Sequence, residues 1–422
     1  MTIPRTPAVA VVGLGYVGLP TALALHESGA RTTGLDVSAE RLGTIASGEP
    51  DLVEADRERL SRARGDTGFT LTTDQSSITE ADAVIICVPT PLDEHLGPEL
   101  SPLRAACRAV VEQARLGQVL ILTSTSFVGT TRQLLAEPLA ERGFTVGEDV
   151  FVAFSPERID PGHPEHTQRA TPRVVGGSTW RCAEKARAVL ELLTPSLHVV
   201  SSAEAAELTK LYENSFRAVN IALANEFAGI CGTLSLDPVE VTKAAATKPY
   251  GFMPFYPGPG VGGHCIPCDP QYLLWQLRAA RVTAPLVDKA MTLIADRPRH
   301  VVTRALETLS AAGRGLAGAR VVVIGVSYKP GVADLRESSA LEIITGLLAL
   351  GAKVDYHDPM VGHVLLRGGR VLENVPEPHG AEWDLALVHT VHPGYDYDWV
   401  RQCPIVLDAT YTFTAAPGRA LV

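Results

Sequence analysis

The chain has 422 residues, of which 46% are hydrophobic and 20% are charged, a composition typical of folded globular proteins rather than disordered ones. Its formal net charge of −10 argues against general binding to nucleic acids or membrane surfaces, so an anionic ligand would need a local basic pocket. The sequence contains no uninterrupted run of about 18 apolar residues, which excludes a membrane-spanning helix.

The first 200 or so residues alternate between short apolar runs, typical of strands, and segments with helical spacing. A helix is predicted over residues 17–28. The predicted strands of this part are residues 8–13, 31–36, 83–89, 118–123 and 149–154. Such alternation of strands and helices implies a parallel sheet that is covered by helices on both faces.

The middle of the chain is helical. Residues 203–234 contain no proline and keep helical spacing, which predicts one long helix of about 30 residues or two helices in series. A helix of that length suits a bridge between domains or a subunit contact rather than a crossover between strands. A loop rich in glycine and proline is predicted over residues 249–270, and further helix extends to about residue 312.

A second block of strands and helices begins at Arg320, with further strands expected in residues 351–358, 383–390 and 404–410. We therefore predict an α/β protein with two Rossmann-like, doubly wound parallel-sheet domains, joined by a helical middle with a long central helix. The predicted boundaries are residues 1–202 for the first α/β domain, 203–312 for the helical middle and 313–422 for the second α/β domain.

Seven cysteines are spread along the chain, at positions 87, 107, 182, 231, 265, 268 and 403. An odd number without regular spacing does not form a disulfide framework. The first seven residues lead directly into a strand-like run and lack the layout of a signal peptide. We therefore expect a cytoplasmic protein with free thiols.

A glycine motif closes the first predicted strand. Gly13, Gly15 and Gly18 have the GxGxxG spacing between a strand and a helix, and Asp36 ends the next strand. Glycines allow the tight turn and the close approach of a pyrophosphate, which the helix N-terminus attracts. An acidic residue at that place accepts hydrogen bonds from the adenosine ribose, so the motif favours NAD over NADP. FAD is the alternative cofactor, and a turn built only for packing is the alternative role.

Lys210 and Asn214 lie one helical turn apart in the long predicted helix, so they share a face. Both side chains can donate hydrogen bonds to a developing alkoxide or oxyanion. The same spacing also fits an ordinary solvated polar stripe, and spacing alone does not separate the two interpretations.

Cys265 is predicted to lie in the glycine-rich loop, with Asp269 four residues further along. The cysteine is a candidate nucleophile, a member of a redox pair with Cys268, or an inert thiol. A zinc site with His264 would need four ligands, and the chain has no second CxxC or HxxxH motif, so no metal is predicted. Combined with an NAD site, a thiolate can oxidise an aldehyde through a thiohemiacetal and a thioester.

Several motifs, in the same order, resemble those of the UDP-glucose/GDP-mannose dehydrogenase family. They are GLGYVGLP, VPTP (88–91), FSPERIDPG (154–162), AELTKLYENSFRAVNIALANE (206–226), PGPGVGGHCIPCDP (257–270) and SYKPGVADLRESSALEI (327–343). The resemblance covers nearly the whole chain. It implies two α/β domains around a long central helix, dimers or larger oligomers formed through that helix, and oxidation of C6 of a nucleotide-linked hexose with two NAD.

The resemblance also implies roles for the candidate catalytic residues. Cys265 matches the nucleophile, and Lys210 and Asn214 match the residues that hold the C6 oxygen and stabilise the oxyanion. Asp269 matches a carboxylate near the water and the lysine, which makes it a candidate base.

Further residues match contacts with water, cofactor and substrate. Glu157 matches the glutamate that activates the hydrolytic water, and Thr125 matches the threonine beside the nicotinamide. The expected NAD contacts are Gly13, Gly15, Tyr16, Val17, Gly18, Asp36, Arg41, Pro89, Thr90, Thr125 and Arg336. The expected contacts with the nucleotide-sugar are Glu157, Arg158, Lys210, Asn214, Phe255, Tyr256, Gly262 and Lys329.

Two positions depart from the family pattern. The segment from Ser124 to Thr130 keeps its threonine, Thr125, but lacks the two prolines that the family usually has there. Cys268 stands where relatives often carry a lysine or an apolar residue, and we assign it no role.

The implied function is that of an NAD-dependent nucleoside-diphosphate-hexose 6-dehydrogenase, which takes an alcohol to a carboxylate by four-electron oxidation. The expected substrate is a UDP-N-acetylhexosamine or UDP-glucose. Thymidine-linked glucose is an alternative, because uracil and thymine differ by one methyl group, and such a difference is worth only about 1–3 kcal/mol.

Two other functions stay open. A two-electron hydroxyacid-type NAD dehydrogenase would explain Lys210 and Asn214 but neither Cys265 nor the second α/β domain. The other alternative is a non-catalytic nucleotide-binding or redox-sensing protein that uses Cys265 and Cys268. Counting the NADH formed per substrate separates the 6-dehydrogenase, which should form two, from the hydroxyacid-type dehydrogenase, which should form one. A metal assay and a thiol count after mild oxidation test the redox-sensing alternative.

Overall fold

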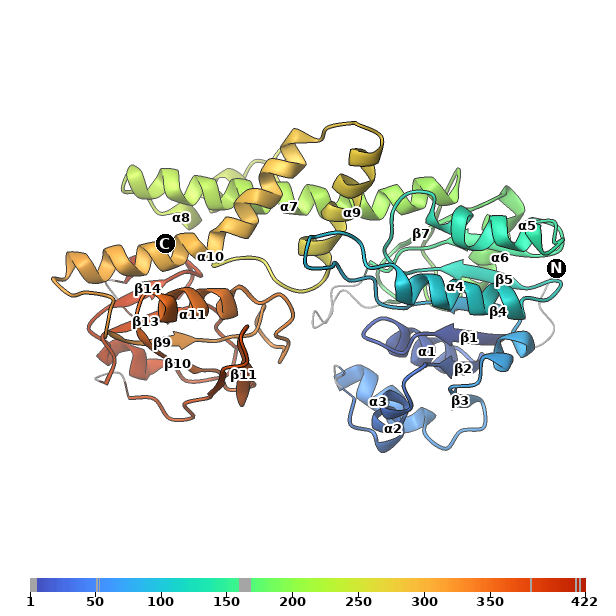
Figure 1. Ribbon diagram of the computed structural model, residues 1–422, viewed down its shortest axis with the longest axis horizontal. Helices are drawn as coiled ribbons and strands as arrows, with labels where there is room; N and C mark the ends of the chain where they lie inside the picture. Colours follow the sequence, from blue (N-terminus) through green and yellow to red (C-terminus); the bar gives the residue numbers. More distant parts are fainter. Residues whose placement is uncertain are drawn as a thin grey trace. The chain divides into compact units, whose positions relative to one another are not determined.

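The structure is a computed structural model that describes residues 6–50, 52, 54–158, 168–379, 382–413, 416 and 419–422. It divides into two compact units (Figure 1), one formed by the chain up to Glu213 with Gln271–Arg281, and one formed by Asn214–Pro270 with Val282–Val422. Two of the three divisions fall within helices α7 (Ala203–Thr233) and α9 (Cys265–Ala279), and the third follows α9 at Arg281. The three-part boundaries proposed from the sequence stay predictions.

The first unit contains an eight-stranded sheet with the order β3-β2-β1-β4-β5-β6-β7-β8. Neighbouring strands are parallel except β6 and β7, so the last two strands run opposite to the rest. The strands are β1 (Ala8–Val12), β2 (Arg31–Leu35), β3 (Phe69–Thr72), β4 (Ala83–Ile86), β5 (Val119–Leu122), β6 (Phe151–Phe154), β7 (Arg173–Gly177) and β8 (Leu197–Val200). This architecture confirms the predicted doubly wound fold, and the reversed pair β7–β8 is an addition that the sequence did not predict.

Helices cover both faces of this sheet because successive strand residues point to opposite sides. Val9 and Val11 pack in one core with α1, α3 and α6, whereas Ala10 and Val12 pack in the other with α4 and α5. The helices that lie wholly within this unit are α1 (Gly18–Glu27), α2 (Ala39–Ser47), α3 (Glu54–Ala63), α4 (Ser101–Gln113), α5 (Glu137–Glu141) and α6 (Trp180–Leu190), with the short helical turns η1 (Gln75–Glu80) and η2 (Arg132–Ala136). The beginning of α7 and the end of α9 also belong to it.

The long helix predicted in the middle of the chain is confirmed as the single helix α7, with 31 residues. It is followed by α8 (Pro238–Ala246), α9 and α10 (Pro285–Ala311). The predicted loop over residues 249–270 ends earlier than expected, because α9 begins at Cys265. Pro267 does not prevent this start, since the first amides of a helix have no acceptor within the helix.

The second unit contains a five-stranded parallel sheet with the order β10-β9-β13-β14-β15 and a separate two-stranded hairpin. Its two faces are again covered, one by α10 and α11 (Ser339–Ala349) and the other by η4 (Asp398–Gln402) and the surrounding loops. The strands are β9 (Arg320–Ile324), β10 (Lys353–His357), β13 (Leu385–Val388), β14 (Val406–Asp408) and β15 (Ala420–Leu421), and the hairpin is β11 (His363–Leu365) with β12 (Val371–Glu373).

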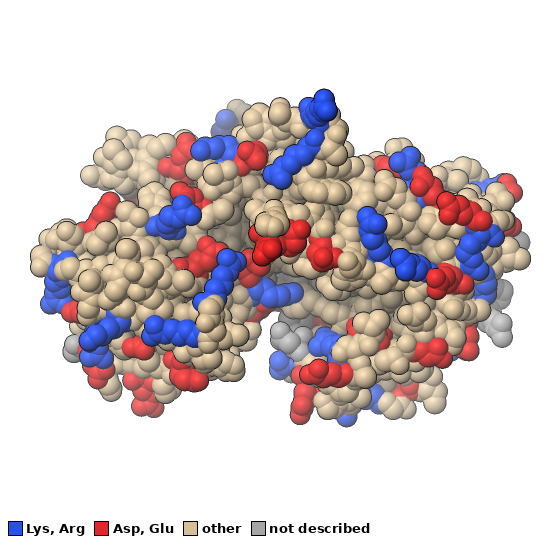
Figure 2. Space-filling model, in the orientation of Figure 1, with Lys and Arg blue, Asp and Glu red and all other residues tan. Residues whose placement is uncertain are grey.

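Among the helices described, none combines the length and the apolar character needed to cross a bilayer. Lysine and arginine side chains are interspersed with aspartate and glutamate over the face shown in Figure 2. Over the residues described, that face therefore carries no wide basic surface.

Candidate active site

The glycine turn after β1 has the geometry that a pyrophosphate requires. Gly13 has a φ of +87°, and a side chain there would meet the backbone of Cys87 and Val88. A Cβ on Gly18 would lie 1.8 Å from the carbonyl oxygen of Gly13, whereas a Cβ on Gly15 would meet nothing within 4 Å. Gly13 and Gly18 are therefore required by the turn itself, while Gly15 leaves open the side from which a ligand would approach.

Asp36 and Arg41 both brace this turn. The Asp36 carboxylate accepts hydrogen bonds from the backbone amides of Leu14 at 2.8 Å and Ser38 at 2.9 Å. The Nε of Arg41 donates to the carbonyl oxygen of Leu14 at 3.0 Å. Each carboxylate oxygen can accept more than one hydrogen bond, so these contacts leave capacity for a ribose hydroxyl.

The second α/β domain repeats this turn but uses its acidic residue differently. The amide of Val326 donates to Asp358 at 2.8 Å, as Leu14 does to Asp36. Asp358 is fully buried and lies 3.3 Å from the Nε2 of His392. Although burial opposes ionisation, this imidazole and the neighbouring amides lower the pKa of Asp358 to about 2. Asp358 is therefore a structural carboxylate held by protein groups, whereas Asp36 is only partly buried.

Two loops flank the glycine turn at the carboxyl ends of β4 and β5. Pro89 is exposed and Thr90 is buried in the first loop, and Thr125 is half-buried in the second. The hydroxyl of Ser124 donates to the carbonyl oxygen of Val88 at 2.8 Å, which joins the two loops. Dinucleotides in this fold lie across the carboxyl ends of the strands, so both loops are placed to contact one.

Glu157 follows β6 and makes contacts in two directions. Its carboxylate accepts hydrogen bonds from the amide of Arg158 at 2.9 Å and from the guanidinium of Arg173, with which it forms an ion pair. Its backbone carbonyl accepts a hydrogen bond from the Nζ of Lys210 at 2.8 Å. The structure thus brings Glu157 and Lys210 together, and it adds Arg173, which is 1% exposed and was not predicted.

Arg158, predicted to bind substrate, is already engaged by protein groups. Its Nη2 lies 2.6 Å from one carboxylate oxygen of Glu213, and its Nε donates to the other at 3.2 Å. Its Nη1 donates to the carbonyl oxygen of Pro172 at 2.8 Å. The rest of the FSPERIDPG motif, from residue 159 onward, lies outside the described residues.

Asn214, Asp269 and Cys265 belong to the second unit. The amide nitrogen of Asn214 on α7 donates to the carboxylate of Asp269, which is 1% exposed. Asp269 lies one helical turn after Cys265 on α9, and Cys265 is the exposed first residue of that helix. The positive end of a helix dipole stabilises a thiolate, so this position suits a nucleophile better than the loop expected from the sequence. Cys268 is buried in the same turn.

The segment that leads to Cys265 is fixed at its glycines. The amide of Gly258 donates to the side chain of Asn225 at 2.9 Å, and its carbonyl accepts from the Nε of Arg297 at 2.9 Å. A Cβ on Gly262 would lie 2.5 Å from the Cβ of Tyr328. This close packing explains the glycine requirement and holds the segment against the second α/β domain.

The aromatic residues of this segment differ in exposure. Phe255 is half-buried against the ring of Phe216, with 6.0 Å between ring centroids, whereas Tyr256 is exposed. Tyr256 is therefore the better placed of the two to contact a ligand through its ring.

Lys329 and Arg336 follow β9 in the second α/β domain. The Nζ of Lys329 lies 5.8 Å from the ring centroid of Tyr328. The Nε of Arg336 donates to Asp334 at 3.0 Å, and its backbone carbonyl accepts a hydrogen bond from Gly263 at 2.8 Å. Both residues thus lie beside the glycine segment before Cys265.

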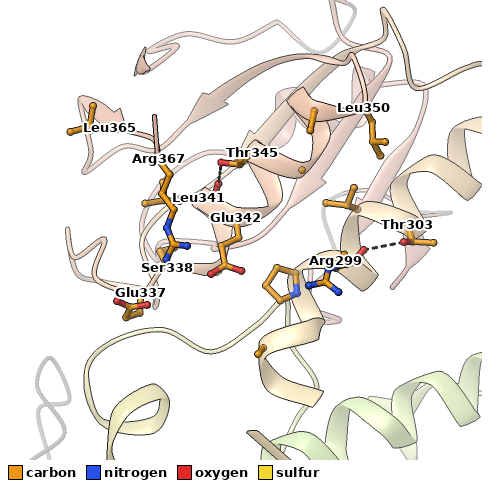
Figure 3. Close-up of a pocket in the computed structure, with 15 residues that line it drawn as sticks. Arg299, Thr303, Glu337, Ser338, Leu341, Glu342, Thr345, Leu350, Leu365 and Arg367 are labelled. Carbon is orange, nitrogen blue, oxygen red and sulfur yellow. Dashed lines mark hydrogen bonds between the residues drawn. The ribbon is translucent and has the colours of Figure 1, made fainter. Parts of the chain in front are cut away.

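A cavity of about 640 Å³ lies between α10, α11 and the β11–β12 hairpin (Figure 3). Arg299 and Thr303 come from α10, and Arg367 comes from the hairpin. Glu337 and Ser338 directly precede α11, and Glu342 lies in its first turn. None of the residues predicted to bind or react lines it, so it is not part of the candidate site.

Several residues that hold the site were missed by sequence reasoning. They are Arg173, Glu207, Asn225, Gln276 and Arg297, which contact predicted site segments from other elements. Glu207 lies one turn before Lys210 on α7, a helical spacing that could have drawn attention to it. Arg173 directly precedes the apolar run VVGG, and a charged residue at such a place is the other sequence feature that could have indicated a buried ion pair.

Comparison with known proteins decides the family. Residues 7–194 match the NAD binding domain of the UDP-glucose/GDP-mannose dehydrogenase family, residues 204–293 match its central domain, and residues 322–415 match its UDP binding domain. The chain belongs to this family. The resemblance seen in the sequence is therefore confirmed, and the protein is a nucleotide-sugar dehydrogenase that uses NAD.

Individual members of the family are similar over most of their length. The UDP-N-acetyl-D-glucosamine 6-dehydrogenase of Pseudomonas aeruginosa is 35% identical over 358 residues, which cover 84% of this chain and 83% of the relative. The NDP-N-acetyl-D-galactosaminuronic acid dehydrogenase of Ralstonia solanacearum is 37% identical over 343 residues, 80% of this chain and 79% of the relative. The structure of UDP-D-ManNAc dehydrogenase from Pyrococcus horikoshii has a TM-score of 0.89 and 30% identity, and it covers 98% of both chains.

Proposed function

We propose that this protein oxidises the C6 alcohol of a UDP-N-acetylhexosamine to a carboxylate, with Cys265 as the covalent nucleophile. The observation that carries the proposal is the position of Cys265, exposed at the first turn of α9, one turn before the Asp269 carboxylate that Asn214 holds. Thiol, carboxylate and carboxamide are thus presented by adjoining turns of two helices. Bound NAD would supply the hydride acceptor, twice per substrate.

The chain's own groups account for the proton and acyl steps. Asp269, or a water held by Lys210, takes the proton of the C6 hydroxyl while the first hydride leaves. The Cys265 thiolate adds to the carbonyl carbon of the resulting aldehyde, and the carbonyl oxygen takes the proton back from that base, which gives a thiohemiacetal. The base removes the same hydroxyl proton again as a second hydride leaves, which gives a thioester.

Hydrolysis completes the reaction. Glu157 takes a proton from water as the water attacks the thioester carbon, and the carbon–sulfur bond breaks to return the Cys265 thiolate. The carboxylic acid that forms loses its proton to solvent and leaves as the carboxylate. Lys210 and Asn214 donate to the oxyanion that forms during this attack. One donor of this kind is worth about 3 kcal/mol of barrier. Thr125 is proposed to lie near the nicotinamide and that water.

The remaining predicted residues are proposed as ligand contacts. Asp36 and Arg41 would hold the adenosine side of NAD, and Arg336 its nicotinamide side. Tyr256, Gly262 and Lys329 would contact the nucleotide-sugar. Arg158 would contribute through the ion pair that fixes Glu213 beside Asn214 rather than as a free cation.

The choice of substrate is supported by the relatives, several of which are named for N-acetylated sugars. UDP-glucose and thymidine-linked glucose are the competing substrates. Turnover should be measured on UDP-linked N-acetylglucosamine, N-acetylgalactosamine and N-acetylmannosamine, and on UDP- and dTDP-glucose. Highest kcat/KM on either glucose nucleotide contradicts the proposed substrate but leaves the chemistry intact.

The covalent mechanism is tested by the two neighbouring cysteines. Wild-type enzyme should form two NADH and one uronate per sugar nucleotide, by absorbance and mass spectrometry. Cys265→Ala and Cys265→Ser should form no uronate, whereas the matched control Cys268→Ala should keep the stoichiometry, because its thiol is buried. Uronate formation by Cys265→Ala at the wild-type rate refutes the nucleophile.

We also propose that α7 pairs with a second copy of this chain. Its second half presents an exposed apolar stripe at helical spacing, formed by Leu223, Phe227 and Ile230, which Leu234 continues directly after the helix. Light scattering should give about twice the chain mass of 44.9 kDa, and a single-chain mass contradicts the pairing.

A further inference from the structure

The loop after β5, residues 124–131 and here called the β5 loop, lacks the two prolines that the family pattern contains. It carries Thr125, and its backbone needs another source of rigidity if that residue is to keep one position. Side chains from α7 and α9 provide it, all within the first unit.

Glu207 of α7 holds the end of the β5 loop. The side chain is buried, with 1% exposure. One carboxylate oxygen accepts a hydrogen bond from the amide of Gly129 at 2.5 Å, and the other accepts from the amide and the hydroxyl of Thr131 at 2.8 and 2.7 Å. Burial raises the pKa of Glu207 above its ordinary value, and these donors act against that shift. A carboxylate buried at this cost is explained by the three donors that it satisfies.

Gln276 of α9 holds the middle of the β5 loop. Its side-chain oxygen accepts from the amide of Val128 at 2.9 Å, and its side-chain nitrogen donates to the carbonyl of Val128 at 2.7 Å. The neighbouring Trp275 packs on Phe127 with 5.6 Å between ring centroids. A reciprocal pair of this kind fixes the two peptide units that flank Val128 in orientation as well as in position.

The same face of α9 also reaches the loop after β4. Tyr272, one turn before Gln276, is buried and donates to the carbonyl oxygen of Thr90 at 3.1 Å. Ser124 joins this loop to the β5 loop. Both loops at the carboxyl ends of β4 and β5 are therefore tied to helices α7 and α9.

We propose that Glu207 and Gln276 are positioning residues that hold the β5 loop, and with it the nicotinamide half of the NAD site, on helices α7 and α9. The inference rests on the proposed position of Thr125 beside the nicotinamide. It adds two residues that touch neither cofactor nor substrate. Their effect on the reaction is exerted through the loop.

Glu207→Gln is the sharpest variant, because it keeps the shape and turns one acceptor oxygen into an NH₂ that faces backbone donors. Gln276→Met removes both bonds to Val128 at similar size. The matched control is Glu204→Gln, on the same helix, whose carboxylate makes a long contact with Arg132 at 3.9 Å. Such exposed pairs contribute little.

Binding of NADH and of ADP-ribose, which lacks the nicotinamide, should be titrated separately. Glu207→Gln should weaken NADH binding about tenfold, the scale of one lost buried hydrogen bond, and leave ADP-ribose binding unchanged. Gln276→Met should act in the same direction, and Glu204→Gln should change neither. KM for NAD should rise while KM for the sugar nucleotide stays constant.

Equal effects on both ligands, or unchanged NADH binding, overturn the proposal. If Glu207→Gln does not fold, the same titrations on Gln276→Met test the proposal. The side chain of Gln276 is only half-buried, so its replacement should not prevent folding. The test is independent of the covalent chemistry, since Cys265→Ala should bind NADH as the wild type does. Loss of uronate in Cys265→Ala and loss of NADH affinity in Glu207→Gln therefore report on different claims.

Discussion

Removing the guanidinium of Arg173 should destabilise the N-terminal α/β domain, because it leaves the carboxylate of Glu157 buried without its cation. The two side chains are 1% and 9% exposed, so water cannot replace the lost partner. Breaking a buried ion pair from one side costs about 3–5 kcal/mol. We expect that loss in the free energy of unfolding for Arg173→Met, and a similar loss for Glu157→Gln, in which Arg173 is the group left unpaired.

The double variant should be less destabilised than the sum of the two singles, since it contains no uncompensated charge. Urea-dependent hydrogen exchange, followed by mass spectrometry of peptides from β6 and β7, measures the stability of this domain separately from the rest of the chain. Single variants that each cost less than about 1 kcal/mol, and add in the double, would refute the reasoning. The experiment also shows how much of any activity loss in Glu157→Gln reflects unfolding rather than chemistry.

Two further predictions concern the glycine turn and pH. Gly18→Ala should lower the melting temperature, because the added Cβ would collide with the carbonyl of Gly13. Gly15→Ala adds a Cβ that meets no protein atom within 4 Å, so it should keep the melting temperature and weaken NADH binding. Calorimetry and an NADH titration distinguish the two variants, and the reverse pattern contradicts the assignment. Burial lowers the pKa of His389 from its ordinary 6.5 to about 4. Between these two pH values the unfolded chain binds a proton at this histidine and the folded chain does not. The free energy of unfolding that is present above pH 6.5 should therefore decrease as the pH falls toward 4. The pKa shift corresponds to about 3 kcal/mol of pH-dependent stability. His389→Gln should abolish this pH dependence, and the control variant at an exposed histidine, His363→Gln, should keep it. Urea titrations that give the same pH profile for wild type and His389→Gln would disprove the prediction.

The elements that could be predicted from the sequence are those with strong local periodicity. The first strand, its glycine turn and α1 were expected from apolar runs and glycine spacing, and α7 from a long helical pattern without proline. The paired strands β7 and β8 and the hairpin β11–β12 were not expected. They are short, and a strand's direction within a sheet depends on partners that lie far away in the sequence.

The candidate site divides in the same way. Cys265, Lys210 and Asn214 were found from motifs, but the pairing of Asn214 with Asp269 depends on how α7 packs beside α9. The start of α9 was also misplaced, because two prolines and a run of glycines obscured the helical pattern that begins at Cys265. Asp36 and Asp358 directly follow equivalent strands, yet only the packing shows that Asp358 is buried against His392.

The sequence by itself determined the family, the cofactor and the identity of the candidate catalytic residues, because these follow from motifs in which particular residue types recur at short, fixed spacings. The tertiary structure alone decided which buried charges meet. Arg173 and Glu157 are 16 residues apart, and Glu207 reaches the β5 loop across 76 residues to Thr131. Such pairs depend on how strands and helices pack in space. A buried charge needs a partner because water cannot solvate it, but the sequence does not show which distant residue packs against it.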